Sequence, residues 1–258
     1  MRTTSTAGVD LHFEILGSGE PLVLLPGAAQ SSAALVENGL AALFAEHFQV
    51  VLMDFTGLGR SDRVERCDND QWAKDVLSVM DAAGLHRAHL AGSSLGGRIA
   101  ARVAANAPER VLTLLVDMPI TSVSDDQDAV IHDLFREFRT NMFADLAPRW
   151  HGPTWEEAMD FFIRARQAPG FRDYFSPGSF LSAIAAPTLL TRGDGMNPVH
   201  PVSQALDWHA AAQRSWLWLE PGAAGDSLMQ ACPDRVVETF VRFVGSMSAD
   251  PSISSVSS

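Results

Sequence analysis

The run Gly92-Ser93-Ser94-Leu95-Gly96 has the residue types of a turn that presents a nucleophile. In a G-x-S-x-G turn the serine sits in a strained backbone conformation between a buried strand and a helix, and the glycines leave room where the two cross. The start of the helix then offers unpaired N–H groups to a developing negative charge. The spacing predicts Ser94 as the chemically important serine and Ser93 as a packing residue.

The hydrophobic pattern predicts the elements that would hold this turn. Apolar runs of strand length alternate with segments of helical spacing, which indicates a mostly parallel sheet covered by helices on both faces. Leu11–Leu16 alternates like an antiparallel edge strand. The runs predicted as buried strands are Pro21–Leu25, Gln49–Asp54, Ala88–Gly92, Val111–Asp117, Pro187–Thr191 and Ser215–Leu219. Helices are predicted at Gln71–Ala83, Leu95–Asn106 and Pro233–Val244.

The alternation stops between about residues 121 and 180, where helical spacing recurs over Asp128–Asp145 and Thr154–Gln167. We interpret this region as a helical cap inserted over the strand ends. The predicted organisation is a core of residues 1–120 and 181–246, the cap at 121–180, and a polar, disordered tail at 247–258. Most cap aromatics are expected to form its own small core. The candidates for a substrate pocket are Trp150, Trp155 and Tyr174.

Four stretches resemble the α/β-hydrolase superfamily and together cover nearly the whole chain. They are Leu24–Ala28, Asp54–Ser61, the serine turn, and Ala186–Leu190 followed by Gly193-Asp194. Each is short, but their order along the chain makes the resemblance specific. It implies an α/β-hydrolase fold with a mostly parallel sheet and a helical cap. It also implies that Ser94 is catalytic and that the backbone N–H groups of Ala28 and Leu95 form an oxyanion hole.

The loop that carries the catalytic acid in this superfamily departs from the family pattern. It reads GDGMNPVH over residues 193–200, so Asn197 occupies the acid position when the loop is aligned on its proline. Asp194 is nearby but early, and it is equally well explained as a solvated loop residue. Asp117, which ends a predicted strand, is a candidate for a displaced acid.

The position of the catalytic histidine is also altered. In the segment GAAGDSLM, residues 222–229, Asp226 occupies the histidine position of the family. An aspartate with a pKa of about 3.9 is a weaker base than an imidazole with a pKa of about 6.5. Its anion would also repel an oxyanion. His200 is the best placed relocated base, and His132 and His151 in the cap are alternatives.

Composition narrows the class of protein. The net charge of −12 over 258 residues argues against nucleic acid and anionic membranes as partners. No apolar run approaches the roughly 20 residues that span a bilayer, and the first residues lack a signal-peptide core, so we expect a cytoplasmic protein. No metal or nucleotide motif occurs, so no cofactor is expected. Cys67 and Cys232 do not suggest a disulfide framework.

Three functions are compatible with these residues. The preferred prediction is a cofactor-free enzyme acting on a hydrophobic, carbonyl-bearing small molecule, as in specialised metabolism, by cyclisation, isomerisation, elimination or C–C bond chemistry. Ser94 would donate a hydrogen bond, and Asp226 with a raised pKa would act as acid or base. The second is a serine esterase, thioesterase or acyltransferase with a relocated histidine base. The third is a non-catalytic ligand-binding protein. The oligomeric state is left open.

Overall fold

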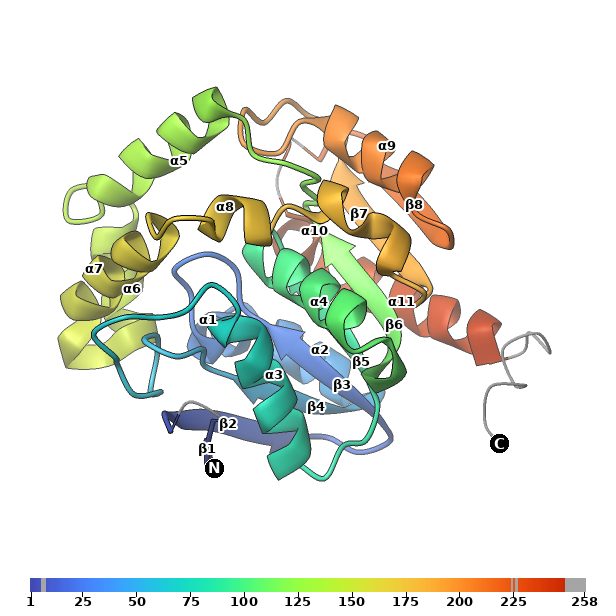
Figure 1. Cartoon of the computed structure of the whole chain (residues 1–258). Helices are drawn as coiled ribbons and strands as arrows, with labels where there is room; N and C mark the ends of the chain where they lie inside the picture. Colours follow the sequence, from blue (N-terminus) through green and yellow to red (C-terminus); the bar gives the residue numbers. More distant parts are fainter. Residues whose placement is uncertain (6–7, 224, 226, 249–258) are drawn as a thin grey trace.

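The structure is a computed structural model that describes residues 1–5, 8–223, 225 and 227–248. In these residues eight strands form one sheet in the order β1-β2-β4-β3-β5-β6-β7-β8 (Figure 1). The strands are β1 (Arg2–Thr4), β2 (Asp10–Leu16), β3 (Glu20–Leu25), β4 (Phe48–Met53), β5 (Ala88–Ser93), β6 (Val111–Asp117), β7 (Thr188–Gly193) and β8 (Ser215–Glu220). Strand β2 pairs antiparallel with both β1 and β4, and the other pairs are parallel.

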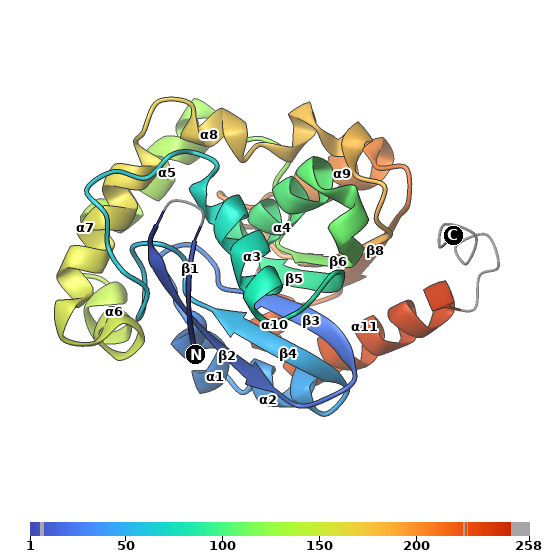
Figure 2. The same cartoon turned by 60° about the horizontal axis from the view of Figure 1, so that its bottom comes forward.

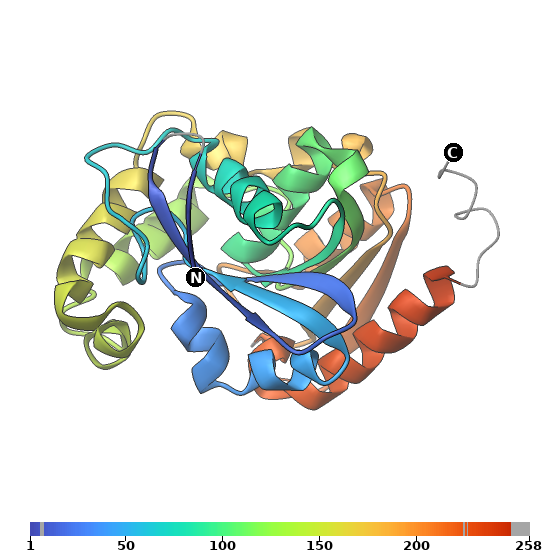
Figure 3. The ribbon, with the colours of Figure 1, turned by 90° about the horizontal axis from the view of Figure 1, so that it is seen from below.

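Helices cover both faces of the sheet, and the side chains of each strand alternate between two apolar layers. On β3, Val23 and Leu25 pack in the cluster that includes α3 (Gln71–Ala82) and α4 (Leu95–Asn106). Leu22 and Leu24 face the opposite cluster, which includes α2 (Leu40–Ala45) and α11 (Pro233–Ser248). Figures 2 and 3 show these two pairs of helices on opposite sides of the strands. The remaining helices of this α/β core are α1 (Ser32–Glu37), α9 (Val202–Ala211) and α10 (Leu228–Ala231).

Between β6 and β7 the chain forms helices, which lie beyond one end of the strands (Figure 1). They are α5 (Asp125–Arg136), α6 (Phe143–His151), α7 (Trp155–Arg166) and α8 (Phe171–Tyr174), with short 3-10 helices at Gly152–Thr154, Pro177–Ser179 and Leu181–Ala183. A further 3-10 turn, Pro108–Arg110, precedes β6. Helix α5 starts at a capping box in which the Ser124 side chain and the Gln127 side chain each bind the other residue's backbone N–H. The name cap is kept below for α5–α8.

The structure corrects three details of the sequence-based prediction. The helix predicted over Asp128–Asp145 is two helices, because Asn141 terminates the first with a bond to the Leu134 carbonyl and accepts the Phe143 N–H at the start of the second. Strand β1 was not predicted. Helix α11 extends to Ser248, so the first two residues assigned to a disordered tail are helical. Residues 249–258 of that tail lie outside the described residues.

In the part of the chain that the structure describes, no helix combines the length and the apolar character that crossing a membrane requires. Within the same residues, no three His, Cys, Asp or Glu side chains are grouped so that they could hold a metal ion.

Candidate active site

Ser94 lies at the sharp turn between β5 and α4 and has the strained backbone that its sequence context predicts. Its φ is 53° and its ψ is −114°, in a region that non-glycine residues rarely occupy. A Cβ on Gly92 would lie 2.5 Å from the Gly96 carbonyl carbon, and one on Gly96 would lie 2.6 Å from the Leu25 carbonyl oxygen. Only glycine fits at these crossings, so the two glycines allow β5 and α4 to approach closely enough to form the turn.

The oxyanion-hole candidates line the same cavity as Ser94. Ala28 follows β3, and Leu95 is the first residue of α4. The Leu95 N–H belongs to the first turn of a helix, where backbone donors lack an intrahelical acceptor. Ala28 is partly exposed, and its N–H has no acceptor among the described residues. Two amides beside one serine hydroxyl can stabilise a developing oxyanion.

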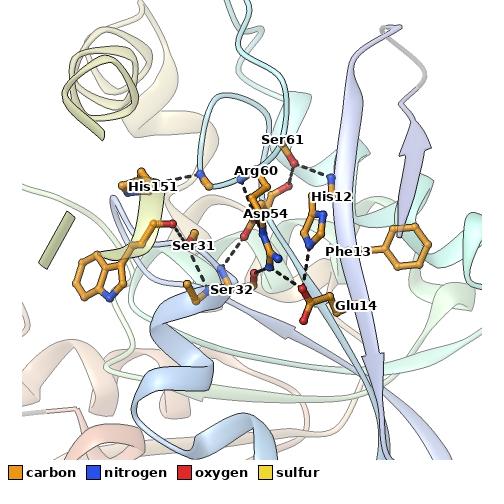
Figure 4. A network of polar contacts seen from close by, with 12 residues as sticks. His12, Phe13, Glu14, Ser31, Ser32, Asp54, Arg60, Ser61 and His151 are labelled. Atoms are coloured by element: carbon orange, nitrogen blue, oxygen red, sulfur yellow. Dashed lines mark hydrogen bonds and ion pairs between the residues drawn. The ribbon is translucent and has the colours of Figure 1, made fainter. Parts of the chain in front are cut away.

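The turn that carries Ala28 is braced by side chains from distant elements (Figure 4). The Asp54 carboxylate accepts the Ser32 N–H at 2.7 Å and the Arg60 N–H at 2.9 Å. From the cap, His151 contacts the Ala29 carbonyl oxygen through Nε2 at 3.0 Å and accepts the Gly59 N–H at Nδ1. Because Nδ1 accepts, Nε2 carries the proton, and burial lowers the pKa of this neutral imidazole. His151 is thus a structural link from the cap to the oxyanion turn.

A cavity of about 220 Å³ lies between Ser94 and the cap. Its walls come from the ends of β3, β5, β6 and β7 and from α5, α7 and α8, which is where parallel α/β sheets bind ligands. The apolar residues that the structure places in the wall are Ala28, Leu95, Ile120, Val123, Ile131, Leu134, Phe135, Phe162, Phe171 and Val199. The wall therefore favours an apolar small molecule, with polar groups concentrated near the serine.

The aromatic residues predicted to line this pocket are not in its wall, which corrects that prediction. Trp150 donates its indole N–H to Glu37 and packs on Phe143. Trp155 packs edge-on against Phe138. Tyr174 lies under the Arg102 guanidinium. These side chains are used in packing, and the sequence pattern identified aromatic character in the cap without fixing which helix face points inward.

His200 contacts Ser94 directly. Its Nε2 lies 2.8 Å from the Ser94 Oγ, although the two residues are 106 positions apart in the chain. His200 belongs to the loop after β7, where the family pattern places the acid. At this separation between Nε2 and Oγ, an imidazole can accept the proton of a hydroxyl group.

The main chain of His200 is held from two sides, by Asn197 of the loop after β7 and by Arg192 of β7 itself. The Asn197 Oδ1 accepts the N–H groups of Val199 and His200, each at 2.9 Å, and its Nδ2 donates to the Gly225 carbonyl oxygen at 3.1 Å. The fully buried Arg192 donates to the His200 carbonyl oxygen through Nε at 3.0 Å and Nη2 at 2.6 Å. Asn197, predicted at the acid position, therefore orients the backbone of the histidine and forms no hydrogen bond with its ring.

The other ring nitrogen of His200 is buried. Within the described residues its Nδ1 has no hydrogen-bond partner. Burial, followed by the positive charges of Arg192 and Arg98, lowers the pKa of His200 from 6.5 to about 3. The ring is neutral at pH 7, so Nε2 can accept a proton when Nδ1 holds the single ring hydrogen.

Asp117, considered as a displaced acid, makes other contacts, which corrects that prediction. The buried Asp117 carboxylate accepts bonds from the hydroxyl groups of Ser93 at 2.9 Å, Thr191 at 2.9 Å and Ser227 at 2.5 Å. Burial raises the pKa of Asp117, while these bonds act in the opposite direction. The Asp117 carbonyl oxygen accepts the Ser94 N–H at 2.8 Å, so this residue anchors the serine turn.

The remaining acid candidates do not complete a charge relay in the described structure. Asp194 is exposed, and its side chain accepts the Gly222 N–H at 2.8 Å. Asp226, predicted as an acid or base, lies outside the described residues.

Among the cap histidines, His132 contacts Gln167 and His151 braces the Ala29 turn. His200 is thus the one histidine in contact with Ser94 among the described residues.

Sequence reasoning missed two arginines of this region and considered His151 only as a base, without predicting its structural role. Arg192 and Arg98 are both buried, and arginines are mostly found at protein surfaces. A signal was available for Arg98, because it lies four residues after Ser94 and therefore on the same face of α4. No comparable signal exists for His151, whose partners are 92 and 122 positions away.

Comparison with known proteins identifies the family. A family model described as the alpha/beta hydrolase fold matches residues 20–175, more than half of the chain. The chain is 41% identical over 108 residues to RutD of Azorhizobium caulinodans, named as a candidate carbamate hydrolase. That match covers 42% of this chain and only 40% of the relative. The 2-hydroxymuconate semialdehyde hydrolase of Pseudomonas sp. (strain CF600) is 27% identical over 241 residues, covering 82% of this chain and 83% of the relative.

Solved structures agree on the architecture. A meta-cleavage product hydrolase from Pseudomonas fluorescens IP01 superposes with a TM-score of 0.69 at 23% identity, covering 97% of this chain and 98% of that one. At this identity the likeness establishes the fold alone. The stretch matched by the family model contains both the Ala28 turn and the Ser94 turn. The chain belongs to the alpha/beta hydrolase fold family.

Proposed function

We propose that the protein hydrolyses an ester or related acyl bond of an apolar small molecule, with Ser94 as nucleophile and His200 as general base. The observation that carries the proposal is the 2.8 Å contact between His200 Nε2 and Ser94 Oγ. The relatives named as hydrolases add support. This is the second of the functions considered from the sequence, and the contact favours it over the non-hydrolytic alternative, which gives Ser94 no base.

The geometry supports a two-step acyl transfer. The Ser94 Oγ attacks the substrate carbonyl carbon while its proton passes to His200 Nε2, and the carbonyl oxygen becomes an oxyanion facing the Ala28 and Leu95 amides. His200 then returns the proton to the leaving oxygen as the C–O bond breaks. A water molecule attacks the acyl-enzyme and gives a proton to His200 Nε2, which passes it to the Ser94 Oγ as the acyl–serine bond breaks, releasing the acid and the free serine. In the described residues this is a serine–histidine pair without an acid partner on Nδ1.

A fluorophosphonate probe tests the proposal, because it phosphonylates activated serines. We expect one probe per chain by intact mass at neutral pH, and loss of labelling in Ser94→Ala. The matched control is Ser93→Ala, because Ser93 is the neighbouring hydroxyl and donates to Asp117 instead of contacting the base. An unlabelled but folded wild-type protein would contradict an activated Ser94 and leave non-hydrolytic chemistry or binding as the function.

The pH dependence of hydrolysis should reflect the environment of the base. Because the pKa of His200 is lowered to about 3, its ring stays unprotonated at pH values where a free imidazole is protonated, while the same shift makes it a weaker base than a free imidazole. We expect kcat/KM for a neutral ester to change little between about pH 8 and pH 5. A base with an ordinary pKa near 6.5 would lose roughly 30-fold by pH 5.

The measurement is chromatographic quantification of the released acid, with circular dichroism at each pH to confirm that the protein remains folded. An acid limb centred near pH 6.5 would show that His200 titrates like a solvated imidazole or that another group acts as the base.

A further inference from the structure

Arg98 lies in the wall of the cavity, one helical turn after Ser94. Its backbone N–H donates to the Ser94 carbonyl oxygen at 3.0 Å, and four residues of α-helix rise about 6 Å. The residue is only 8% exposed. An arginine this deeply buried next to a catalytic serine needs a physical explanation, because guanidinium groups are costly to remove from water.

The protein contacts of Arg98 are hydrogen bonds to carbonyl oxygens, and the Asp128 carboxylate acts on its charge without forming an ion pair with it. Its Nε donates to the Phe175 carbonyl oxygen, and its Nη2 lies 3.4 Å from the Arg172 carbonyl oxygen. No carboxylate in the described part of the chain forms an ion pair with it. Burial, followed by the nearby charge of Arg166, lowers the pKa of Arg98 to about 9, so the group still carries its charge at neutral pH.

Among the described residues, the charged side chains around the cavity do not balance. Three of these residues that line it are arginines, Arg98, Arg166 and Arg172, and one is a carboxylate, Asp128. Arg166 is paired with Asp128. Arg172 is paired with Asp125, which is 93% exposed and does not line the cavity. The net charge of the chain is −12, so its surface as a whole repels anions. The excess of positive charge among the described residues of this cavity is therefore a local exception that favours an anion.

We propose that Arg98 is the binding site for an anionic group of the substrate, a carboxylate held about one helical turn from the carbonyl that Ser94 attacks. This inference rests on the proposed hydrolysis for the identity of the reacting carbonyl. Guanidinium groups bind carboxylates with fixed, charge-assisted geometry. The neighbouring wall is apolar, including Ile131, Leu134 and Phe135. The substrate class is therefore an ester or related acyl compound that carries both an aliphatic or aromatic portion and one carboxylate.

A bound carboxylate would also affect the base. The charge of Arg98 is one of the two arginine charges that disfavour protonation of His200. An anion paired with Arg98 offsets that charge and makes proton transfer from Ser94 to His200 more favourable. The site would then strengthen the base when the correct substrate is bound, which couples recognition to catalysis.

A pair of esters with the same shape and different charge tests the site. The probes are the mono-p-nitrophenyl ester of glutaric acid, which carries a carboxylate, and the p-nitrophenyl ester of glutaramic acid, which carries a neutral primary amide. We expect wild-type kcat/KM to favour the acid by roughly 10- to 100-fold, the size of a charge-assisted interaction. Arg98→Gln should reduce the ratio to near one, and Arg98→Lys should retain part of it.

Arg102→Gln is the matched control. Arg102 lies one turn further along α4 and donates to the Tyr174 carbonyl oxygen, but it does not line the cavity. This control loses a similar bond to the cap and should keep the wild-type ratio. Equal turnover of the two esters by the wild-type protein would overturn the carboxylate site while leaving the hydrolase proposal intact, and this comparison does not depend on whether Arg98→Gln folds.

Binding without chemistry separates the two proposals. Calorimetry with hexanoate and hexanamide measures the preference for an anion directly. Tighter binding of hexanoate, lost in Arg98→Gln and partly retained in Arg98→Lys, supports the site even if neither ester is hydrolysed, and in that case only the hydrolase proposal fails. Equal binding of the two compounds by the wild-type protein, or a preference that persists in folded Arg98→Gln, overturns the assignment to Arg98.

Discussion

Replacing His200 by alanine is expected to lower kcat/KM for ester hydrolysis by roughly 10⁴-fold or more, comparable to the loss of the histidine in other serine hydrolases. The reason is that His200 Nε2 is 2.8 Å from the Ser94 Oγ and is the one basic nitrogen in contact with it among the described residues. Without the ring, the hydroxyl must lose its proton to water. The oxyanion amides remain, so the residual rate should exceed the uncatalysed one.

The measurement is steady-state hydrolysis of p-nitrophenyl butyrate, with fluorophosphonate labelling as a second readout that should fall in parallel. His132→Ala is the control, because this cap histidine was also a candidate base but contacts Gln167. It should keep the wild-type rate. Unchanged hydrolysis by a folded His200→Ala protein would exclude the relocated base, and loss in His132→Ala instead would place the base in the cap.

The fold follows from local patterns in the sequence, which explains why it could be predicted. The alternation of apolar runs located β2 through β8, and the helical spacing located α3, α4, α7 and α11. The errors occur where a local interaction decides the outcome. One example is the break at Asn141, whose side chain binds backbone on both sides of it. Another is the short strand β1, whose three residues are too few to show a period.

The site was predictable only where its chemistry is local in sequence. The Ser94 turn and the Leu95 amide are set by adjacent residues, so the motif alone identified them. His200 could be named as a candidate from its loop, but its choice over the cap histidines depends on the distance to a hydroxyl 106 positions away. The pocket aromatics were misassigned because packing decides which face of a cap helix points inward. Arg98 was missed because its burial depends on the cap covering α4.

Ser94→Ala and Asp226→Ala differ in how much activity each is expected to lose, and which loss is larger distinguishes acyl-enzyme hydrolysis from the non-hydrolytic chemistry that the sequence first suggested. We expect Ser94→Ala to lower kcat/KM by roughly 10⁵-fold or more, because it removes the atom that forms the covalent bond. Asp226→Ala should cost less, whatever its local contacts, because even an acid that orients a catalytic histidine contributes less than the nucleophile. The strained φ of 53° at Ser94 supports this order, since strain of this kind persists where it presents a reacting group.

Non-hydrolytic catalysis would give the reverse order, since Asp226 would then move the proton while Ser94 would only donate a hydrogen bond to the substrate. Removing one such donor costs about 10²- to 10³-fold and leaves measurable turnover. The two variants should therefore be compared on the same substrate, with rapid-mixing kinetics to look for a burst of alcohol release. A burst in the wild-type protein that vanishes in Ser94→Ala would identify the acyl-enzyme. Retention of turnover in Ser94→Ala with its loss in Asp226→Ala would instead make Asp226 the catalytic acid or base, and the contact between His200 and Ser94 would then serve only to hold the serine as a hydrogen-bond donor.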